Sequence, residues 1–281
     1  MVSLLHSMRQ RREPAPPNPF TCRYLLFEEI GRGRCASVHF ALDIDRKTTA
    51  AVKIGDASDF QRKVFANEAE ALSRLSHPNV VGLLDCGVSC GLPYIAMEHV
   101  PGMNLRESRL KMGLRERLGT VAAVCGALEA AHEAGIVHRD VKPKNIVVSR
   151  ADGQARLLDF GFALLDGVSP VQAGRFGNPL YAAPEQKENR GYCDHRADIY
   201  SAGILLYEQL IQSPAPLIDM LRIAGIRSGS VPIYFGRHGQ AEIEAFCIVE
   251  RAVEREPAGR FQSAGEMRKA VERVIEGLDA A

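Results

Sequence analysis

The stretch IVHRDVKPKNIVV, residues 136–148, constrains the possible fold more than any other part of the sequence. A loop of charged and amide side chains lies there between two short apolar runs that are typical of β-strands. A further apolar run, ARLLDFG at 155–161, follows the turn sequence RADGQ. These runs therefore predict a β-hairpin that turns at Asp152 and Gly153.

The predicted hairpin places two oxygen ligands side by side. Folding about the turn brings Asn145 abreast of Asp159, and amide and carboxylate oxygens are hard ligands suited to Mg²⁺. Asp140 and Lys142 precede Asn145 in the same loop. The carboxylate can accept a hydroxyl proton, and the ammonium can neutralise a migrating phosphoryl group. Because phosphoryl transfer depends on positioning and charge neutralisation more than on covalent chemistry, the loop indicates that reaction.

A lysine in an apolar strand points to a second charged pair. Lys53 lies in the run TAAVKI, where a buried ammonium costs free energy unless an acid pairs with it. The helical period from about 60 to 75 places Glu68 at the centre of an apolar face and Glu70 nearly opposite, toward solvent. We therefore expect Lys53 to pair with Glu68.

A glycine pair in EEIGRGRCASVHF lies between two predicted strands. Gly31 and Gly33 let the backbone approach a phosphate closely, with N–H groups free to donate. Val38 begins the next strand at a spacing that would place an apolar side chain over a base. Many hairpins contain such glycines, so the pair indicates a nucleotide site only together with the lysine strand that follows.

The pattern along the chain predicts an α+β fold with two lobes. Residues 1–19 are proline-rich and are expected to form a flexible tail. A small β-rich N-lobe is expected at about 20–98, a hinge at about 98–102, and a larger helical C-lobe at about 103–277. Ligands often bind in the crevice of such a protein.

Composition excludes several classes of protein. The net charge is +1, from 35 basic and 34 acidic residues, so nucleic acid and anionic membranes are not expected as partners. The seven cysteines contain no CxxC pair, and their odd number is typical of a reducing compartment. The apolar run VAAVCGALEAA is far shorter than the ~20 residues of a membrane span. The N-terminal charge block follows its apolar patch, the wrong order for a secretory signal, so we expect a cytoplasmic protein.

Taken in order, these motifs resemble those of the eukaryotic-like, bacterial-type serine/threonine protein kinases, from about residue 24 to 277. The glycine pair with Val38 resembles the glycine-rich loop, AVK at 51–53 the strand lysine motif, and Glu68 its helical partner. HRDVKPKN resembles the catalytic loop, and DFG at 159–161 resembles the metal-binding motif.

The later part of the chain carries the same resemblance. APE at 183–185 resembles the end of the activation segment, and Arg260 matches the arginine that pairs with its acid. Asp198 matches the aspartate of a buried helix that anchors the catalytic loop. Met97 matches the gatekeeper, and the backbone of Glu98 to Val100 matches the hinge that binds adenine.

The resemblance implies a bilobal protein-kinase-like fold and transfer of the γ-phosphoryl group of ATP to a serine or threonine hydroxyl of a protein substrate, with Mg²⁺ or Mn²⁺. A regulatory partner could bind the tail or the N-lobe. The implied catalytic residues are Asp140, Lys142, Lys53 and Glu68; the implied nucleotide-binding residues are Ile30, Gly31, Gly33, Val38, Ala51, Lys53, Met97, Glu98 and Val100; the implied metal ligands are Asn145 and Asp159.

Three departures from the family pattern bear on function. Ala36 replaces the third glycine of the loop. Asn178 replaces a threonine that, in the family, hydrogen-bonds the catalytic aspartate and lysine. The asparagine amide can still donate and accept hydrogen bonds, but its side chain is longer than that of threonine. The segment from Asp159 to Glu185 has no threonine and a single serine, Ser169. Many relatives are switched by a phosphothreonine in this segment, so we expect activity here not to require its phosphorylation.

Two other functions stay open on the sequence. A pseudokinase scaffold would bind nucleotide without transfer, but it would be marked by loss of Lys53, Asp140 or Asp159, and all three are present. A small-molecule kinase of the aminoglycoside type would share the aspartate-to-asparagine loop. It would lack the Ala-Pro-Glu motif, so that motif and Arg260 favour a protein substrate.

Overall fold

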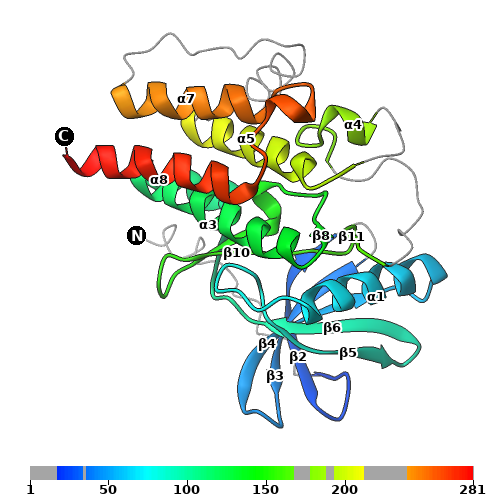
Figure 1. Ribbon diagram of the computed structural model, residues 1–281. Helices are drawn as coiled ribbons and strands as arrows, with labels where there is room; N and C mark the ends of the chain where they lie inside the picture. The colour runs from blue at the N-terminus through cyan, green and yellow to red at the C-terminus, as the bar shows by residue number, and fades with distance from the viewer. Residues whose placement is uncertain (1–17, 34–35, 168–177, 188–192, 212–238, 281) are drawn as a thin grey trace, which may run out of the picture. The chain divides into compact units, whose positions relative to one another are not determined.

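The computed structural model describes residues 18–33, 36–167, 178–187, 193–211 and 239–280 (Figure 1). The chain forms two compact units. The β unit comprises Met1–Arg62 and Leu84–His99, and the helical unit comprises Lys63–Leu83 and Val100–Ala281. A β-rich and a helical unit confirm the predicted α+β class. One boundary between the units lies at His99, inside the expected hinge. A second boundary lies within the first helix, and most of that helix belongs to the helical unit.

The β unit is built around a sheet in the strand order β1-β2-β3-β4-β6-β5. Its strands are β1 (Asn18–Pro19), β2 (Tyr24–Arg32), β3 (Ala36–Asp43), β4 (Thr48–Gly55), β5 (Leu83–Ser89) and β6 (Leu92–Glu98). Apolar side chains alternate along them, and Tyr24, Leu26, Ala50 and Val52 are buried together in the core. The last two residues of the expected tail form β1, which pairs with β2; residues 1–17 lie outside the described part.

Buried charge also joins the strands of this unit. Asp43 is fully buried, and Arg23 donates to both of its carboxylate oxygens at 3.0 and 2.7 Å. The Arg23 hydrogen bonds hold the pKa of Asp43 below its ordinary value. Two parallel hydrogen bonds to one carboxylate are stronger than a single contact, so this pair fixes the start of β2 against the end of β3.

The helical unit contains most of the remaining elements. They are α1 (Asp59–Ser73), β7 (Gly102–Asn104), α2 (Leu105–Ser108), η1 (Arg109–Lys111), α3 (Leu114–Glu133), β8 (Ile136–Val137), η2 (Pro143–Asn145), β9 (Ile146–Ser149), β10 (Ala155–Leu157), β11 (Leu164–Leu165), α4 (Pro184–Lys187), α5 (Arg196–Ile211), α7 (Gln240–Ala252), η3 (Pro257–Gly259) and α8 (Ala264–Ala280). In the part of the chain that the structure describes, no helix combines the length and apolarity that crossing a membrane requires.

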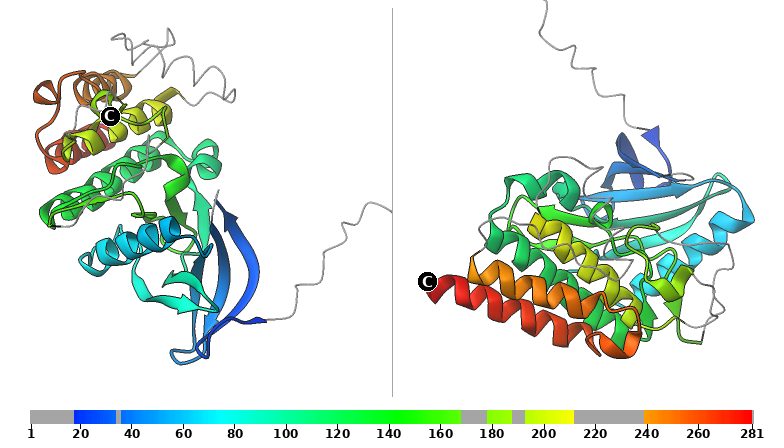
Figure 2. Two further views of the ribbon diagram at one scale, coloured as in Figure 1. Left: turned by 90° about the vertical axis from the view of Figure 1, so that its right-hand side faces the viewer. Right: turned by 90° about the horizontal axis from the view of Figure 1, so that it is seen from above.

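Helix α5 forms the centre of this unit. Every residue from Ala197 to Leu210 is buried, so this mostly apolar helix is enclosed on all sides. Helix α5 packs against α3 and α7, and α8 packs against both α3 and α7. Figure 2 shows α7 and α8 running side by side. The loop that follows α3 is therefore attached to the packed core of this unit.

A short strand, which the sequence did not predict, begins at the end of the expected hinge. Gly102–Asn104 form β7, which pairs with β9 so that Gly102 lies opposite Ser149. A Cβ atom at Gly102 would lie 2.1 Å from the carbonyl oxygen of Val148, so only glycine fits this close approach of two backbones. This pairing extends the predicted hairpin to a three-stranded sheet, β10-β9-β7.

Candidate active site

The predicted catalytic loop is held by a buried aspartate at the start of α5. The carboxylate of Asp198 accepts hydrogen bonds from the backbone N–H groups of His138 and Arg139, at 2.8 and 2.7 Å. Its Oδ2 also lies 2.9 Å from Nε2 of His132. Burial alone would raise the pKa of Asp198, but these hydrogen bonds lower it below its ordinary value. The anchoring role that the resemblance implied for Asp198 is thus confirmed.

Two residues near the site have left-handed backbones without being glycine. Arg139 has a φ of 64° and Asp159 a φ of 65°. Such conformations cost about 1–3 kcal/mol each and persist only where the surroundings impose them. At Arg139, the bond from its N–H to Asp198 and the bond from its Nε to the carbonyl of Phe162, at 2.8 Å, impose the conformation. The loop thus turns sharply just before Asp140.

His138 connects the loop to the segment that carries Asp159. Its ring is fully buried and lies 4.5 Å from the ring of Phe160. Nδ1 accepts from the backbone N–H of Asp140 at 3.2 Å, which requires Nε2 to carry the proton that is donated to the carbonyl of Leu158 at 3.0 Å. The neutral imidazole therefore ties Asp140 to the strand that precedes Asp159.

Asp140 is oriented by contacts on both of its carboxylate oxygens. Oδ2 forms an ion pair with Nζ of Lys142 and accepts from Nδ2 of Asn145 at 3.1 Å. Oδ1 accepts from the backbone N–H of Asn178 at 3.2 Å. Asp140 is 4% exposed, so the direction of its carboxylate is set by these donors rather than by water. The structure brings Asp140, Lys142 and Asn145 together, as the sequence predicted.

The hairpin also has the predicted form. Gly153 has a φ of 69° at the turn, and Ile146 lies opposite Leu157. The N–H of Leu158 donates to the carbonyl of Asn145 at 2.8 Å, so Asp159 is one residue beyond the partner of Asn145. Because Nδ2 of Asn145 faces Asp140, its amide oxygen is the atom that can coordinate a cation.

The donor set fits a magnesium ion. Asn145 and Asp159 offer one amide and one carboxylate oxygen, and Mg²⁺ is commonly held by one or two carboxylates together with substrate phosphates. Within the described residues, no group of three or more histidine, cysteine or acidic side chains could hold a metal by itself. Water molecules and the phosphates of a bound substrate would supply the other ligands of such a cation.

Helix α1 presents its two glutamates as predicted. Glu68 is fully buried, whereas Glu70 is exposed and pairs with Arg74 at 2.8 Å. A Cβ atom at Gly161 would lie 3.5 Å from Oε2 of Glu68, so this glutamate lies against the segment that begins at Asp159. The pairing of Glu68 with Lys53, which belongs to the β unit, stays a prediction.

In the β unit, four of the predicted nucleotide-binding side chains share one face of the sheet. Val38 lies opposite Lys53, and Ala51 lies opposite Met97, and directly opposed residues lie on the same face. Gly31 lies opposite Val38 in the hairpin of β2 and β3.

The remaining predicted nucleotide-binding residues flank that face. Ile30 is 47% exposed, Gly33 is exposed and Glu98 is exposed at the end of β6. Val100 is half-buried and begins the second part of the helical unit. Their roles toward a nucleotide stay predictions.

Asn178 contacts Asp140 in a way that the sequence did not predict. The contact uses the backbone N–H rather than the amide side chain. The side-chain oxygen instead accepts from the N–H of Leu180 at 3.1 Å, which closes the turn that leads to Tyr181. The asparagine thus acts as a turn residue. The prediction about Ser169 falls outside the described residues.

The segment after this turn is fixed by a second set of polar contacts. The hydroxyl of Tyr181 donates to Oε2 of Glu208 at 2.6 Å, and Arg109 pairs with Glu208 at 3.3 Å. Nε2 of Gln186 donates to the carbonyl of Arg139 at 3.1 Å. Sequence reasoning missed Glu208 and Gln186. The signal for Glu208 was an acid within the apolar helix that follows Asp198, since such a group needs a partner.

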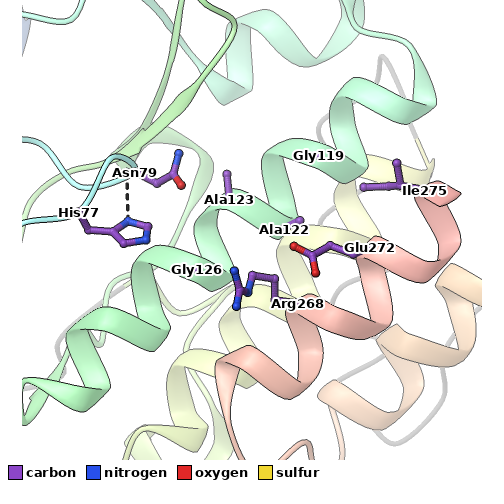
Figure 3. A pocket seen from close by; sticks show the side chains of 9 residues that line it. All are labelled: His77, Asn79, Gly119, Ala122, Ala123, Gly126, Arg268, Glu272 and Ile275. Atoms are coloured by element: carbon purple, nitrogen blue, oxygen red, sulfur yellow. Dashed lines mark hydrogen bonds between the residues drawn. The ribbon is translucent and has the colours of Figure 1, made fainter.

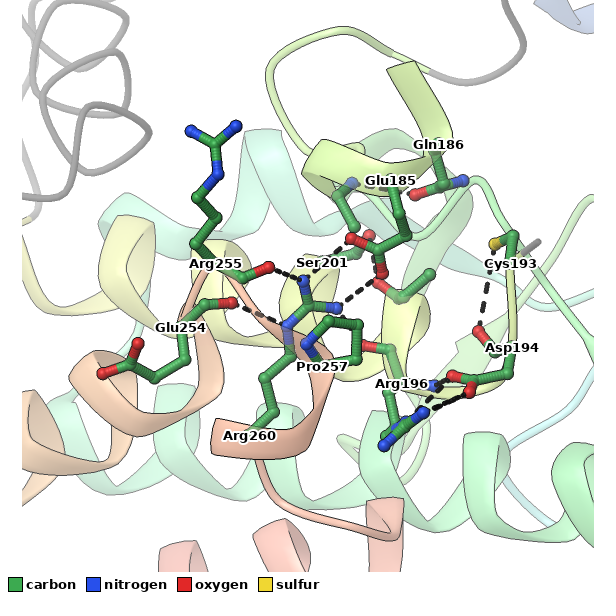
Figure 4. Close-up of polar contacts among 12 residues, drawn as sticks. Glu185, Gln186, Cys193, Asp194, Arg196, Ser201, Glu254, Arg255, Pro257 and Arg260 are labelled. Atoms are coloured by element: carbon green, nitrogen blue, oxygen red, sulfur yellow. Dashed lines mark hydrogen bonds and ion pairs between the residues drawn. The ribbon is translucent and has the colours of Figure 1, made fainter. Parts of the chain in front are cut away.

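Arg260 pairs with Glu185, as the resemblance implied. Figure 4 shows its guanidinium pointing at the carboxylate, with N–O distances of 2.7 and 2.8 Å. The same guanidinium donates to the carbonyls of Glu254, Arg255 and Arg196, at 2.8, 2.9 and 2.9 Å. Its side chain is fully buried. A single cation therefore joins α4, α5 and the loop before α8.

We expect Arg260→Leu to lower the free energy of unfolding by about 3–5 kcal/mol, because it leaves the Glu185 carboxylate and three carbonyls without their donor. Arg74→Ala, which removes the exposed pair with Glu70, should cost at most about 1 kcal/mol. Urea denaturation followed by circular dichroism measures both. Similar losses in the two variants would show that Arg260 contributes no more than a surface ion pair.

A separate cavity of about 300 Å³ lies in the helical unit. Figure 3 shows small residues of α3, among them Gly119 and Gly126, facing Arg268 and Glu272 of α8. None of the predicted site residues lines it. It therefore belongs to the contact between α3 and α8 rather than to the site built around Asp140.

Comparison with known families identifies the class of protein that this fold and site define. The protein kinase domain family matches residues 24–219, which is more than half of the chain. The chain belongs to the protein kinase family. This confirms the resemblance drawn from the order of its motifs.

The chain is similar to several curated bacterial kinases. It is 35% identical to serine/threonine-protein kinase PknB of Mycobacterium leprae and 36% identical to PknB of Mycolicibacterium smegmatis, in each case over 93% of this chain and 44% of the relative. It is 36% identical to the probable serine/threonine-protein kinase SCO3848 of Streptomyces coelicolor, over 91% of this chain and 40% of the relative. The chain thus spans less than half the length of these relatives.

Proposed function

We propose that this protein is a serine/threonine protein kinase that transfers the γ-phosphoryl group of ATP to a hydroxyl of a protein substrate. The observation that carries the proposal is the orientation of Asp140 by Lys142, Asn145 and the N–H of Asn178, beside the carboxylate-bearing Asp159. The curated relatives are named as serine/threonine kinases, which supports the same hydroxyl acceptors.

In this proposal Asp140 orients the acceptor hydroxyl and accepts its proton. The hydroxyl oxygen forms a bond to the γ-phosphorus while the bond from that phosphorus to the β–γ bridging oxygen breaks, and ADP leaves with the electron pair. Lys142, already paired with Asp140, stabilises the charge on the phosphoryl oxygens. Asn145 and Asp159 would hold Mg²⁺ or Mn²⁺, which would spread the negative charge of the nucleotide phosphates.

A protein substrate is favoured over a small molecule because the segment around 181–186 is rigid. Tyr181 is bonded to Glu208, Glu185 to Arg260 and Gln186 to the carbonyl of Arg139. The Gln186 contact connects this segment, in which residues 181–183 are buried, directly to the catalytic loop. A segment fixed in this way is what docking of an extended peptide requires. Free thiols at all six cysteines among the described residues support the proposed cytoplasmic location. The proposal also includes a regulatory partner that binds the N-terminal tail or the N-lobe.

The test is incubation with labelled ATP and Mg²⁺ in the presence of a generic basic protein, followed by identification of the phosphorylated amino acid. Label on serine or threonine, absent with Asp140→Asn, supports the proposal. Nucleotide binding without transfer would instead identify a pseudokinase scaffold. Transfer to an aminoglycoside but not to protein would identify a small-molecule kinase.

We expect Lys53→Met to lower kcat/KM by about 10²–10³-fold, the usual effect of removing one preorganised donor to a developing charge. Glu68→Gln should lower it less, because the neutral amide can still hydrogen-bond the ammonium. Glu70→Gln is the matched control, since Glu70 is exposed on the same helix. Steady-state kinetics on a peptide substrate provide the measurement. Equal effects of the two glutamine variants would exclude a special role for Glu68.

A further inference from the structure

Asn67, which neither the motifs nor the comparisons assign, contacts the metal-binding segment from helix α1. The residue is buried, with 6% of its surface exposed. Nδ2 lies 2.9 Å from the carbonyl oxygen of Ala163, 3.3 Å from that of Gly161 and 3.4 Å from that of Phe160. One amide group thus contacts three of the four carbonyls that directly follow Asp159.

These contacts lie within a close approach of helix and segment. A Cβ atom at Gly161 would lie 2.8 Å from Cγ1 of Val64, which is one turn before Asn67 on the same face. The next residue, Glu68, also lies near Gly161. At this distance no water layer separates α1 from the segment, and the amide group supplies a direct polar contact between them.

The segment needs a donor at this place. The strained φ at Asp159 begins a turn that closes with the bond from the N–H of Ala163 to the carbonyl of Phe160, at 3.0 Å. Its carbonyls converge on Nδ2 of Asn67. A buried carbonyl that loses its donor costs about 1–3 kcal/mol, and neighbouring carbonyl dipoles that point to one place repel each other. Removal of the amide would favour other conformations of residues 159–163.

We propose that Asn67 is a positioning residue for the metal-binding Asp159, and that it keeps the register between this segment and the helix that carries Glu68. This inference rests on the proposed function, because it assigns Asp159 a role in holding Mg²⁺ with the nucleotide. The side chain acts through the backbone of residues 160–163 and does not itself contact the substrate.

The test uses Asn67→Leu and Asn67→Asp. The leucine has similar size without a donor, and the aspartate has the same shape but places an acceptor against three carbonyls. The matched control is Asn79→Leu. Asn79 donates Nδ2 to the carbonyl of Ala155 at 2.9 Å in the same unit, and so contacts the strand that precedes Asp159 rather than the segment that follows it.

Two measurements separate positioning from general stability. We expect both Asn67 variants to need about 10-fold more Mg²⁺ for half-maximal binding of a non-hydrolysable ATP analogue in calorimetry, with adenosine binding unchanged. We also expect amide hydrogen exchange to increase in peptides covering 159–167. Asn79→Leu should lower the melting temperature without either change. Circular dichroism at the assay temperature confirms that each variant is folded.

The inference is overturned if Asn67→Leu matches the Asn79→Leu control in both Mg²⁺ requirement and exchange of 159–167. Hydrogen exchange does not depend on phosphoryl transfer, so the two proposals fail separately. If the wild-type protein transfers no phosphate but the Asn67 variants show faster exchange, the proposed function is wrong and the positioning role still holds. If the wild-type enzyme is active but the Asn67 variants show normal exchange, only the positioning role is wrong.

Discussion

Asp140→Asn is expected to lower kcat for phosphoryl transfer by about 10²–10⁴-fold, the range that a positioned general base contributes. The dissociation constant for the nucleotide should change little, because Asp140 is assigned to the acceptor hydroxyl rather than to ATP. Asparagine keeps the shape of the side chain, so the contact with the N–H of Asn178 can survive. It cannot accept a proton at neutral pH, and its amide group would face the cation of Lys142.

The matched control is Lys144→Gln, which changes an exposed charge in the same loop. Single-turnover kinetics would separate the chemical step from product release, and calorimetry would follow nucleotide binding. We expect the control to stay within about twofold of wild type, as is usual for a surface charge. A kcat for Asp140→Asn close to that of the control would remove Asp140 from the catalytic role.

The parts of this protein that the sequence predicted correctly depend on local pattern. The hairpin followed from alternating apolar residues on either side of Asp152 and Gly153, and its register places Asn145 next to the strand that leads to Asp159. The helical period likewise separated buried Glu68 from exposed Glu70. Period and turn chemistry act over a few residues, so one sequence is enough to determine them.

The parts that the sequence did not predict depend on contacts between distant segments. Asn67 meets carbonyls more than ninety positions further along the chain, and nothing in an asparagine specifies which backbone it will meet. Asn178 contacts Asp140 through its own backbone, which any residue carries. The pairing of Gly102 with β9 likewise depends on which distant strand packs against it.

Backbone strain at the site was also invisible in the sequence. Left-handed conformations are expected at glycine, and neither Arg139 nor Asp159 gives that signal. A buried hydrogen bond fixes the backbone at each of these two residues. Asp198 accepts from the N–H of Arg139, and the His138 ring donates to the carbonyl of Leu158 just before Asp159. The rigid core around α5 therefore supplies the stability that offsets the strain at the two residues.

The largest effect on nucleotide binding is expected for Asp159→Asn. We expect the Mg²⁺-dependent affinity for a non-hydrolysable ATP analogue to fall by at least about 100-fold, beyond the ~10–100-fold loss typical of groups that only orient metal ligands. The reason is charge: a carboxylate holds a hard dication better than an amide does. Asn145→Ala removes only a neutral oxygen donor and should cost about 10-fold.

When Mg²⁺ is withheld, the effect of Asp159→Asn on nucleotide affinity should have the opposite sign. Without the cation, the carboxylate of Asp159 repels the nucleotide phosphates, so the asparagine variant should then bind the analogue as well as wild type or more tightly. Asp152→Asn is the matched control, because it removes a carboxylate at the exposed turn of the same hairpin and should change neither affinity. Calorimetric titrations with and without Mg²⁺ provide the comparison. An Asp159→Asn protein whose affinity for the nucleotide is independent of Mg²⁺ supports the assignment, whereas one that keeps the full wild-type response to Mg²⁺ places the cation elsewhere.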